Sequence, residues 1–305
     1  MIERVVTLFL DGVGLGEDDP QVNPFAGARL PVLQALLDGA RLTRANAGLS
    51  TRSASLVALD AQLGVSGVPQ SGTGQTTLLT GLNAAALLGY HDGPYPHPSL
   101  HPMLRRGSLF RRLLAVRRPA AFANAYTEPF LSRVRRGTQR LSANARAALL
   151  AGLKLRGAAE LSAGRAVSAL LTNDYFRRSG YMVPEVSPAA AGAQLAQLSG
   201  DHDLTFFEFW HTDVAGHRQD WQLALDVLAT LDEFIGGLMT ALNMERCLVL
   251  IVGDHGNLED LRTSKHTLNP ALGLLVGSEH RQLAERLHSL ADVTPAVLSA
   301  LGAGQ

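Results

Sequence analysis

The stretch Val5-Val6-Thr7-Leu8-Phe9-Leu10-Asp11-Gly12, near the amino end, decides how the rest of the chain is interpreted. Six apolar or β-branched residues in a row predict a strand that is buried on both faces of a sheet. The run stops at an acidic residue, so Asp11 is expected at the carboxyl end of that strand. In open α/β sheets this edge is where ligands collect.

Three further apolar runs predict strands of the same sheet, and two of them also lead into polar motifs. Leu204–Trp210 is followed by the motif Asp213-Val-Ala-Gly-His217, and Leu248–Val252 is followed by Gly253-Asp254-His255-Gly256-Asn257. The third run is Ala271–Val276. If these strands lie in one parallel sheet, their polar motifs meet at one edge and share one site.

Helical patterns separate these strands. Between residues 221 and 238, apolar side chains recur every three or four positions, which predicts an amphipathic helix. Shorter helices are predicted at Leu30–Leu37 and Glu279–Leu290. The alternation predicts an α/β fold, with a mostly parallel sheet covered by helices on both faces.

Residues 89–192 differ from the segments that flank them. The stretch His91–Pro98 carries three prolines in five positions, which is typical of a loop. Arginine-rich helical stretches and the apolar run Ala120–Tyr126 follow it. We interpret residues 89–192 as a cap domain inserted into an α/β core of residues 1–88 and 193–305.

Composition limits the partners. The 305-residue chain has a formal net charge of zero, which argues against a general attraction to nucleic acid or to an anionic membrane. Its single cysteine, Cys247, lies in an apolar run and excludes an internal disulfide framework. No apolar run approaches the ~20 residues of a membrane helix, and no secretory segment is visible. A cytoplasmic protein is expected, whereas its oligomeric state is not predicted.

A candidate nucleophile lies in Gln70-Ser71-Gly72-Thr73-Gly74-Gln75, just before the helical pattern Gln75–Leu82. A hydroxyl there would face exposed backbone N–H groups and the positive end of a helix dipole. Serine is a weak nucleophile at neutral pH unless a base or a cation activates it. Alone, the same pattern also fits a glycine-rich turn in which Ser71 caps the helix.

Seven residues with metal-ligand side chains occur in five short motifs. Three carboxylates, three imidazoles and one hydroxyl suit two divalent cations that share a nucleophile. Taken singly, Asp213 with His217 also fits an ion pair, and Asp254-His255 also fits a turn. Their joint occurrence is the stronger signal. The seven are Asp11, Ser71, Asp213, His217, Asp254, His255 and His266.

The order of these motifs resembles the alkaline phosphatase superfamily, in the branch of cofactor-independent phosphoglycerate mutase and phosphopentomutase. Two more stretches agree, Leu231–Gly236 and Leu290–Leu298. The resemblance implies that one ion is held by Asp11, Ser71, Asp254 and His255, and the other by Asp213, His217 and His266. Oxygen and imidazole ligands suit Mn²⁺ or Zn²⁺ equally.

The resemblance also implies an activity: two-metal phosphoryl transfer from a small phosphate monoester through a phosphoserine at Ser71, in a phosphomutase or a phosphohydrolase. Sulfatases of the superfamily share Leu79-Thr80-Gly81, but they have Pro and Arg where this chain has Thr73 and Gln75. The mutases have His at Gln75. The alternatives are a sulfatase, a phosphodiesterase or a non-catalytic metal-binding protein.

Four residues are weaker candidates for substrate contacts. Asn23 follows an acidic loop and resembles a substrate-proximal turn of the mutases. Lys265 adjoins His266. Arg133 and Arg136 belong to a basic cluster with Arg135 and Arg140 that could hold a second anionic group. For all of these, a solvated surface role competes with substrate binding.

Overall fold

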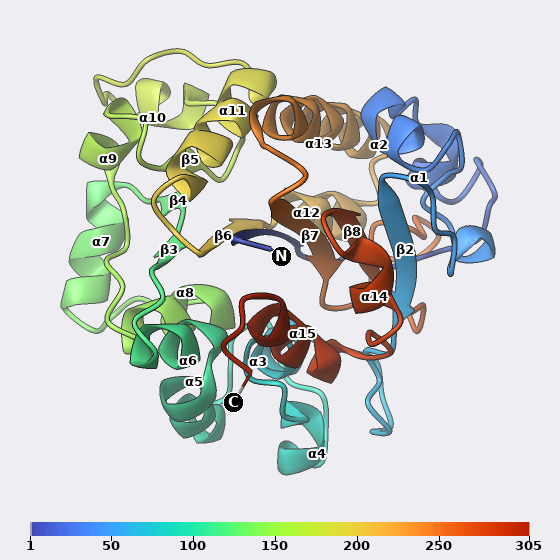
Figure 1. Ribbon diagram of the computed structural model, residues 1–305, viewed down its shortest axis with the longest axis horizontal. Coiled ribbons are helices and arrows are strands. Elements are labelled where there is room, and N and C mark those ends of the chain that lie inside the picture. Colours follow the sequence, from blue (N-terminus) through green and yellow to red (C-terminus); the bar gives the residue numbers. More distant parts are fainter. Residues whose placement is uncertain (1, 305) are drawn as a thin grey trace.

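The computed structural model describes residues 2–304 and is built on a six-stranded sheet with the order β2-β8-β7-β1-β6-β3. Figure 1 shows the sheet in the middle of the molecule, with both chain ends near it. The predicted α/β architecture with a mostly parallel sheet is confirmed. The strands are β1 (Arg4–Leu10), β2 (Ala54–Leu59), β3 (Ala120–Phe122), β6 (Leu204–Phe209), β7 (Cys247–Gly253) and β8 (Ala271–Gly277).

The central strand, β1, pairs in parallel with β6 on one side and with β7 on the other. Leu10, its last residue, lies opposite Phe209 of β6 and Gly253 of β7, each the last residue of its own strand. Three strands therefore end side by side, and the residues that follow them start from one edge of the sheet. This register explains why motifs far apart in sequence meet.

The direction of β8 differs from the parallel arrangement expected for it. It pairs antiparallel with β7 and with β2. A parallel connection would need a crossover, usually through a helix, whereas residues 254–270 contain no helix. The chain instead turns back at the ligand edge, so His266 lies at that edge just before β8 begins. The helix expected at Glu279–Leu290 is also shorter, since it consists of α14 (His280–Ala284) and the 3₁₀ turn η3 (Leu290–Asp292).

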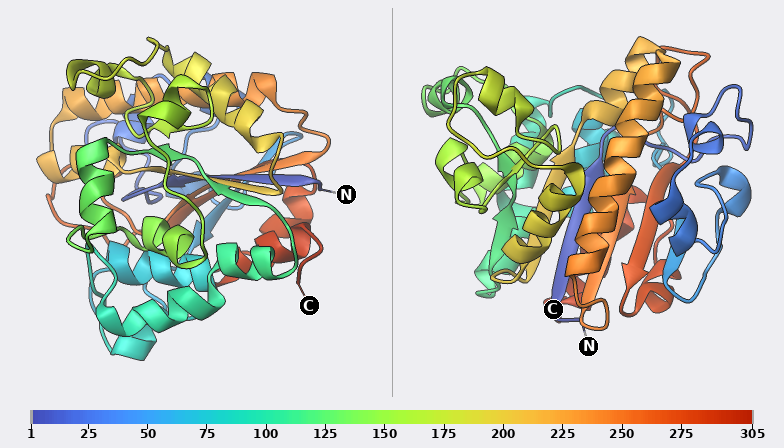
Figure 2. Two further views of the ribbon diagram at one scale, coloured as in Figure 1. Left: turned by 90° about the vertical axis from the view of Figure 1, so that its left-hand side faces the viewer. Right: turned by 90° about the horizontal axis from the view of Figure 1, so that it is seen from above.

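Side chains of β1 alternate between two apolar layers. Val5 and Phe9 enter one layer, while Val6 and Leu8 enter the other, as the period of two in a strand requires. Figure 2 shows the sheet edge-on between two sets of helices. The first layer includes side chains of α3 (Ser71–Thr80), α5 (His101–Gly107), α6 (Leu109–Ala115), α8 (Ala143–Leu150) and α15 (Val293–Ala300).

The second layer packs beneath helices on the opposite face. The long helix predicted at residues 221–238 is α13, and the short one at Leu30–Leu37 is α2, so both predictions are confirmed. The helices of this face are α1 (Pro24–Gly27), α2 (Pro31–Leu36), α11 (Pro188–Ser199), α12 (His211–Arg218) and α13 (Trp221–Ala241). The chain also forms α4 (Ala84–Leu88) and the 3₁₀ turns η1 (Arg44–Asn46) and η2 (Pro98–Leu100).

Part of the predicted insert belongs to the main layers. β3 pairs in parallel with β6 at the sheet edge, and α5, α6 and α8 pack on the same face as α3. The remaining elements gather beside that edge, on the left of Figure 1. They are β4 (Asn124–Ala125), α7 (Glu128–Arg135), α9 (Ala158–Ser162), β5 (Val167–Ser168) and α10 (Asp174–Arg178). Of these, β4, α9 and α10 contribute to a small apolar cluster that includes Phe176, whereas α7 packs against the first layer. The boundary of a separate cap domain stays a prediction.

Between residues 2 and 304, none of the helices combines the length and the apolar character that crossing a membrane requires.

Candidate metal centre

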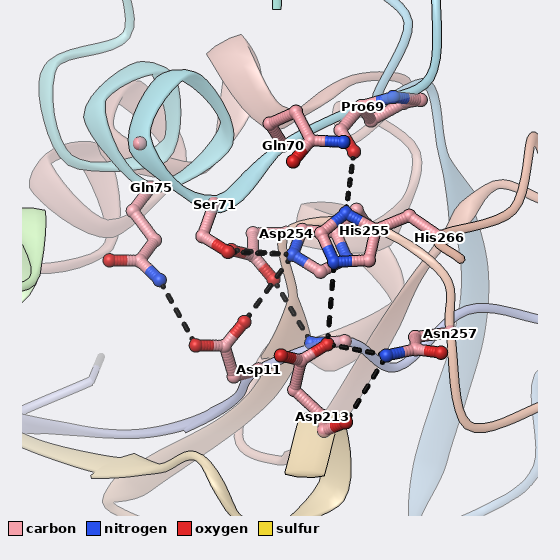
Figure 3. A network of polar contacts seen from close by, with 12 residues as sticks. Asp11, Pro69, Gln70, Ser71, Gln75, Asp213, Asp254, His255, Asn257 and His266 are labelled. Atoms are coloured by element: carbon pink, nitrogen blue, oxygen red, sulfur yellow. Dashed lines mark hydrogen bonds and ion pairs between the residues drawn. The ribbon is translucent and has the colours of Figure 1, made fainter. Parts of the chain in front are cut away.

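All seven residues with metal-ligand side chains gather at the edge where β1, β6 and β7 end. Asp11 follows β1, and Asp254 and His255 follow β7. Asp213 and His217 lie four residues apart on α12, which begins after β6 and presents both on one side. Figure 3 shows six of the seven around a common centre.

Ser71 is the first residue of α3, one position later in the helix than the capping role considered for it. Its side chain is buried, and its Oγ lies 3.0 Å from Nε2 of His255. The same nitrogen lies 3.4 Å from Oδ1 of Asp11 and 3.6 Å from Oδ2 of Asp254. One hydroxyl, one imidazole and two carboxylates therefore converge at the positive end of the α3 dipole.

A second group consists of Asp213, His217 and His266. Nδ1 of His217 is 2.7 Å from the carbonyl of Ser264, and Nδ1 of His266 is 2.9 Å from the carbonyl of Pro69. Only a protonated Nδ1 can donate to a carbonyl, so in each neutral ring Nε2 carries the lone pair. The Nε2 atoms of His217 and His266 lie 3.3 Å apart. They lie 3.2 Å from Oδ2 and 3.6 Å from Oδ1 of Asp213, respectively.

Two lone pairs and a carboxylate facing one another repel unless a proton or a metal ion lies between them. A histidine that binds a metal through one ring nitrogen usually donates a hydrogen bond from its other ring nitrogen, often to a backbone carbonyl. In the other group, Oδ1 of Asp11 and Oδ2 of Asp254 are buried, and they have no hydrogen-bond partner closer than the imidazole of His255, at 3.4 and 3.6 Å. Ligand atoms of Asp213, His217 and His266 lie within 4.8 Å of one another, as do those of Asp11, Asp213 and His255. The donor set thus fits two cations.

The electrostatics agree with this. Burial raises the pKa of Asp254 and of Asp11 above their usual range. Burial also opposes the charged form of His255, but Asp254 and Asp11 outweigh it and raise its pKa to about 10. Burial and the charge of His255 lower the pKa of His266 to about 4, which keeps that ring neutral. Asp11 and Asp254 therefore favour a positive charge beside them. The proton on His255 supplies that charge, and a divalent ion could supply it instead.

Close packing constrains the backbone around these ligands. Gly12 adopts a φ of +67°, and a Cβ at this position would lie 2.5 Å from Oδ1 of Asp213. Its N–H lies 3.3 Å from Oδ1 of Asp254. Glycine after Asp11 is therefore required both by the left-handed conformation and by the approach of α12.

A buried carboxylate that the sequence analysis missed, Glu259, anchors the loop between β7 and β8. Asn257, in the same loop, donates from Nδ2 to Oδ1 of Asp213 at 2.7 Å and so orients that ligand. No local sequence pattern around Glu259 predicts that it anchors this loop. Its oxygens accept hydrogen bonds from the backbone of Gly14 and Asn257 and from the side chains of Thr267 and Asn269.

A polar network links Asp11 to the start of α8. Gln75 donates from Nε2 to Oδ2 of Asp11 at 3.3 Å, and its Oε1 accepts from the backbone N–H of Ala143 at 3.2 Å. Gln75 is the position at which the sequence departs from the mutases. Its amide here connects a candidate ligand to a helix from the predicted insert.

Glu208, one residue before the end of β6, is a second group that the sequence analysis missed. It is buried, and it accepts from Oγ of Ser142 at 3.1 Å and from Nδ2 of Asn144 at 3.0 Å. Burial, reinforced by the charge of Asp11, raises its pKa to about 7. The only sequence signal was an acidic residue inside an otherwise apolar strand.

A cavity of about 640 Å³ adjoins the cluster on the side of Asp11 and Gln75. Its size is within the range of small-molecule sites, which are roughly 300–1,000 Å³. Glu208 and Trp210 line it from the end of β6, and residues of α7, of α8 and of the segment before α8 close it. The cavity thus joins the candidate metal centre to the elements beside the sheet edge.

The weaker substrate candidates are placed differently. Asn23 is fully buried; it caps α1 by accepting from the N–H of Phe25 and donates to the carbonyl of Glu17, which indicates a structural role instead of a substrate contact. Lys265 is exposed beside His266. Arg133 lines the cavity, but Arg136 is not among its lining residues and donates instead to Ser132. Arg140, from the same basic cluster, does line it.

The chain is similar to known proteins both by family model and by sequence. The model of the metalloenzyme superfamily matches residues 3–305. The 2,3-bisphosphoglycerate-independent phosphoglycerate mutase of Desulforudis audaxviator is 32% identical over 126 residues, which cover 39% of this chain and 25% of the mutase. The same enzyme of Moorella thermoacetica is 33% identical over 124 residues, covering 39% and 24%. The chain therefore spans about a quarter of the length of the curated relatives it matches.

Solved structures share the fold at low sequence identity. A protein from Pyrococcus horikoshii superposes with a TM-score of 0.60 at 14% identity, covering 100% of this chain and 98% of that one. A mutant of TAB5 alkaline phosphatase has a TM-score of 0.54 at 12% identity, covering 99% and 98%. Leishmania mexicana phosphoglycerate mutase has a TM-score of 0.50 at 11% identity, covering 99% and 96%. The architecture is thus that of the alkaline phosphatase group.

Proposed function

The chain belongs to the metalloenzyme superfamily, and from that premise we propose that it catalyses metal-dependent phosphoryl transfer from a small phosphate monoester through a phosphoserine at Ser71. Asp11, Ser71, Asp254 and His255 would hold one divalent ion. Asp213, His217 and His266 would hold the other. The ligand types favour Mn²⁺ or Zn²⁺ without deciding between them.

One observation carries the proposal. The Nε2 atoms of His217 and His266 lie 3.3 Å apart, and a backbone carbonyl holds the Nδ1 atom of each ring. Such a pair is stable when a cation binds both nitrogens. A buried serine at the start of a helix lies close by, 3.0 Å from His255. Metal ligands and a nucleophile within one cluster favour an enzyme over a purely structural metal site.

When bound, the two ions would neutralise the phosphate and lower the pKa of the serine hydroxyl. Oγ of Ser71 would then form a bond to phosphorus while the ester P–O bond breaks, and the alcohol would leave with a proton. The N-terminus of α3 favours the negative phosphoryl group on its first residue. A second acceptor then takes the phosphoryl group from Ser71 and regenerates the hydroxyl.

The nature of that acceptor separates two forms of the activity. Water as acceptor makes the protein a phosphohydrolase, and a second hydroxyl of the bound substrate makes it a phosphomutase. A mutase has to exclude water during the transfer. The cavity beside Asp11 is where the alcohol portion of the substrate would remain in that case.

The test is phosphorus NMR of the protein loaded with Mn²⁺ or Zn²⁺ and mixed with a panel of sugar phosphates and glycerate phosphates. Growth of inorganic phosphate identifies a phosphohydrolase, and conversion of one ester into another identifies a phosphomutase. Ser71→Ala should abolish both reactions and still bind metal, whereas Ser179→Ala, at an exposed serine after α10, should leave them unchanged. Undiminished turnover by Ser71→Ala would refute the phosphoserine.

A further inference from the structure

The cavity beside the metal centre contains an unusual share of aromatic side chains. Six of its 22 lining residues are aromatic, against 6% of the whole chain. Tyr126 and Phe130 stack face to face, with ring centroids 4.4 Å apart. The others are Tyr95, Tyr175, Phe176 and Trp210. Walls of this kind favour a planar ring over a small, highly hydrated polyol.

Trp210 holds a particular position among them. It is the last residue before α12, so it lies between Glu208 of β6 and the candidate ligand Asp213. One side of its indole packs on the ring of His211, with centroids 4.1 Å apart. The side chain nevertheless remains 41% exposed and lines the cavity. A large aromatic residue that is exposed inside a cavity, next to metal ligands, offers a stacking surface for a bound ring.

Ten of the other lining residues carry polar or charged side chains. Glu208 is one of the residues that line the cavity, and Nε2 of His211, another lining residue, is buried without a hydrogen-bond partner. Aromatic walls combined with hydrogen-bonding groups match an alcohol that carries both a planar ring and hydroxyl groups.

The two arginines of the cavity already have partners within the protein. Nε of Arg133 donates to Oε1 of Gln139 at 2.7 Å. The guanidinium of Arg140 lies over the ring of Tyr95, 4.4 Å from its centroid. A dedicated clamp for a second anionic group is therefore less well supported than recognition of a ring.

We propose that the substrate is a phosphate monoester of an alcohol the size of a nucleoside, whose planar aromatic ring stacks on Trp210 while its phosphate lies at Ser71. This inference rests on the proposed function and deepens it. It makes Trp210 the residue that distinguishes ring-bearing esters from simple sugar phosphates. The ester group reaches the metal centre through the side of the cavity that Asp11 and Gln75 line.

The kinetic test compares adenosine 5′-monophosphate with ribose 5-phosphate. Both esters release a primary alcohol at the same carbon of ribose, so they differ mainly in the ring. The expected preference in kcat/KM for the nucleotide is about five- to 150-fold, the range that stacking of one base on an aromatic side chain provides. Trp210→Ala should remove most of this preference, and Trp210→Phe should keep much of it.

A binding test needs neither metal nor turnover. The chain has two tryptophans, and Trp221 packs at the start of α13 against α1. In the Trp221→Phe protein, fluorescence therefore reports Trp210 alone. Adenosine 5′-monophosphate should quench it saturably, and ribose 5-phosphate should not.

The outcomes separate this inference from the proposed function. Equal kcat/KM for the two esters, with no quenching, overturns the inference while leaving phosphoryl transfer in place. Saturable quenching by the nucleotide, with no turnover of these two esters or of the sugar and glycerate phosphates, supports the ring site and overturns the proposed function. Absence of quenching, together with absence of turnover of every ester tested, overturns both the ring site and the proposed function.

Discussion

Replacing Glu208 by glutamine should make the protein more stable at alkaline pH. Glu208 is 4% exposed, and its oxygens accept from Ser142 and Asn144. Burial and the nearby charge of Asp11 raise its pKa to about 7. Glutamine has the same shape, can still accept from Asn144 and can donate to the hydroxyl of Ser142. The substitution therefore removes the ionisable group and keeps the packing.

The magnitude follows from linkage between protonation and folding. The ordinary pKa of this carboxyl group is 4.5, against about 7 in the folded protein. Because the folded pKa is the higher one, the stabilising contribution is fully present below pH 4.5 and is lost as pH rises to 7. One pKa unit corresponds to about 1.36 kcal/mol, so wild-type protein should lose about 3 kcal/mol relative to the variant over this interval.

The assay is urea unfolding of wild-type and Glu208→Gln protein in the presence of a chelator at pH 5, 6, 7 and 8. The two proteins should be nearest in unfolding free energy at pH 5, and the variant should gain progressively up to about pH 7. Glu245→Gln, at an exposed position, makes the same chemical change and should follow the wild-type profile. The reasoning is refuted if the difference in unfolding free energy between Glu208→Gln and wild type changes by less than about 0.5 kcal/mol from pH 5 to pH 8, because surface substitutions scatter by that much.

Three further predictions follow from packing and from the metal centre. Gly192→Ala should lower the unfolding free energy in urea by about 1–3 kcal/mol, since its Cβ would lie 2.0 Å from the carbonyl oxygen of Phe234 and force α11 away from α13. Gly107→Ala, where a Cβ meets nothing within 4 Å, is the matched control and should change stability little. His217→Ala should weaken Zn²⁺ or Mn²⁺ binding at least about tenfold in calorimetric titration, because it removes a nitrogen lone pair that faces His266; unchanged affinity would exclude His217 as a ligand. When the free metal ion is supplied at 100 times its Kd, removing it with a chelator should lower the free energy of unfolding by about 2.7 kcal/mol per ion, seen as a lower melting temperature. An unchanged melting temperature would contradict a metal centre in the folded protein.

The sequence predicted much of the fold because its strands are buried on both faces. Continuous apolar runs such as Val5–Leu10 stand out against helical periodicity, and they were placed correctly. Strand direction was harder, because β8 is as apolar as its neighbours. β8 runs antiparallel to β7 because the connection between them, residues 254–270, contains no helix. The strand at Ala120–Phe122 was assigned to the insert because only its pairing with β6 shows that it belongs to the main sheet.

The candidate site was predictable to a similar degree. Its seven ligand-type residues occur in recognisable motifs, and the structure brings them together, although their roles in metal binding and catalysis remain predictions. Glu208 and Glu259 lie in no such motif, and Gln75, the last residue of the Ser71 motif, is not one of the seven ligand-type residues. Their importance comes from partners more than 60 residues away for Glu208 and Gln75, and from a loop that closes only in the folded chain for Glu259.

The sequence by itself determined which segments are buried and which polar residues end them, because burial and the periodicity of strands and helices are local properties of the chain. Only the tertiary structure decided which strand ends coincide, which helix covers the site and how a cavity with aromatic walls lies beside it. These depend on strand register and on contacts between distant residues, such as Gln75 with Ala143 of α8. Local patterns carry no information about such contacts, since the energy that selects them comes from packing the whole molecule.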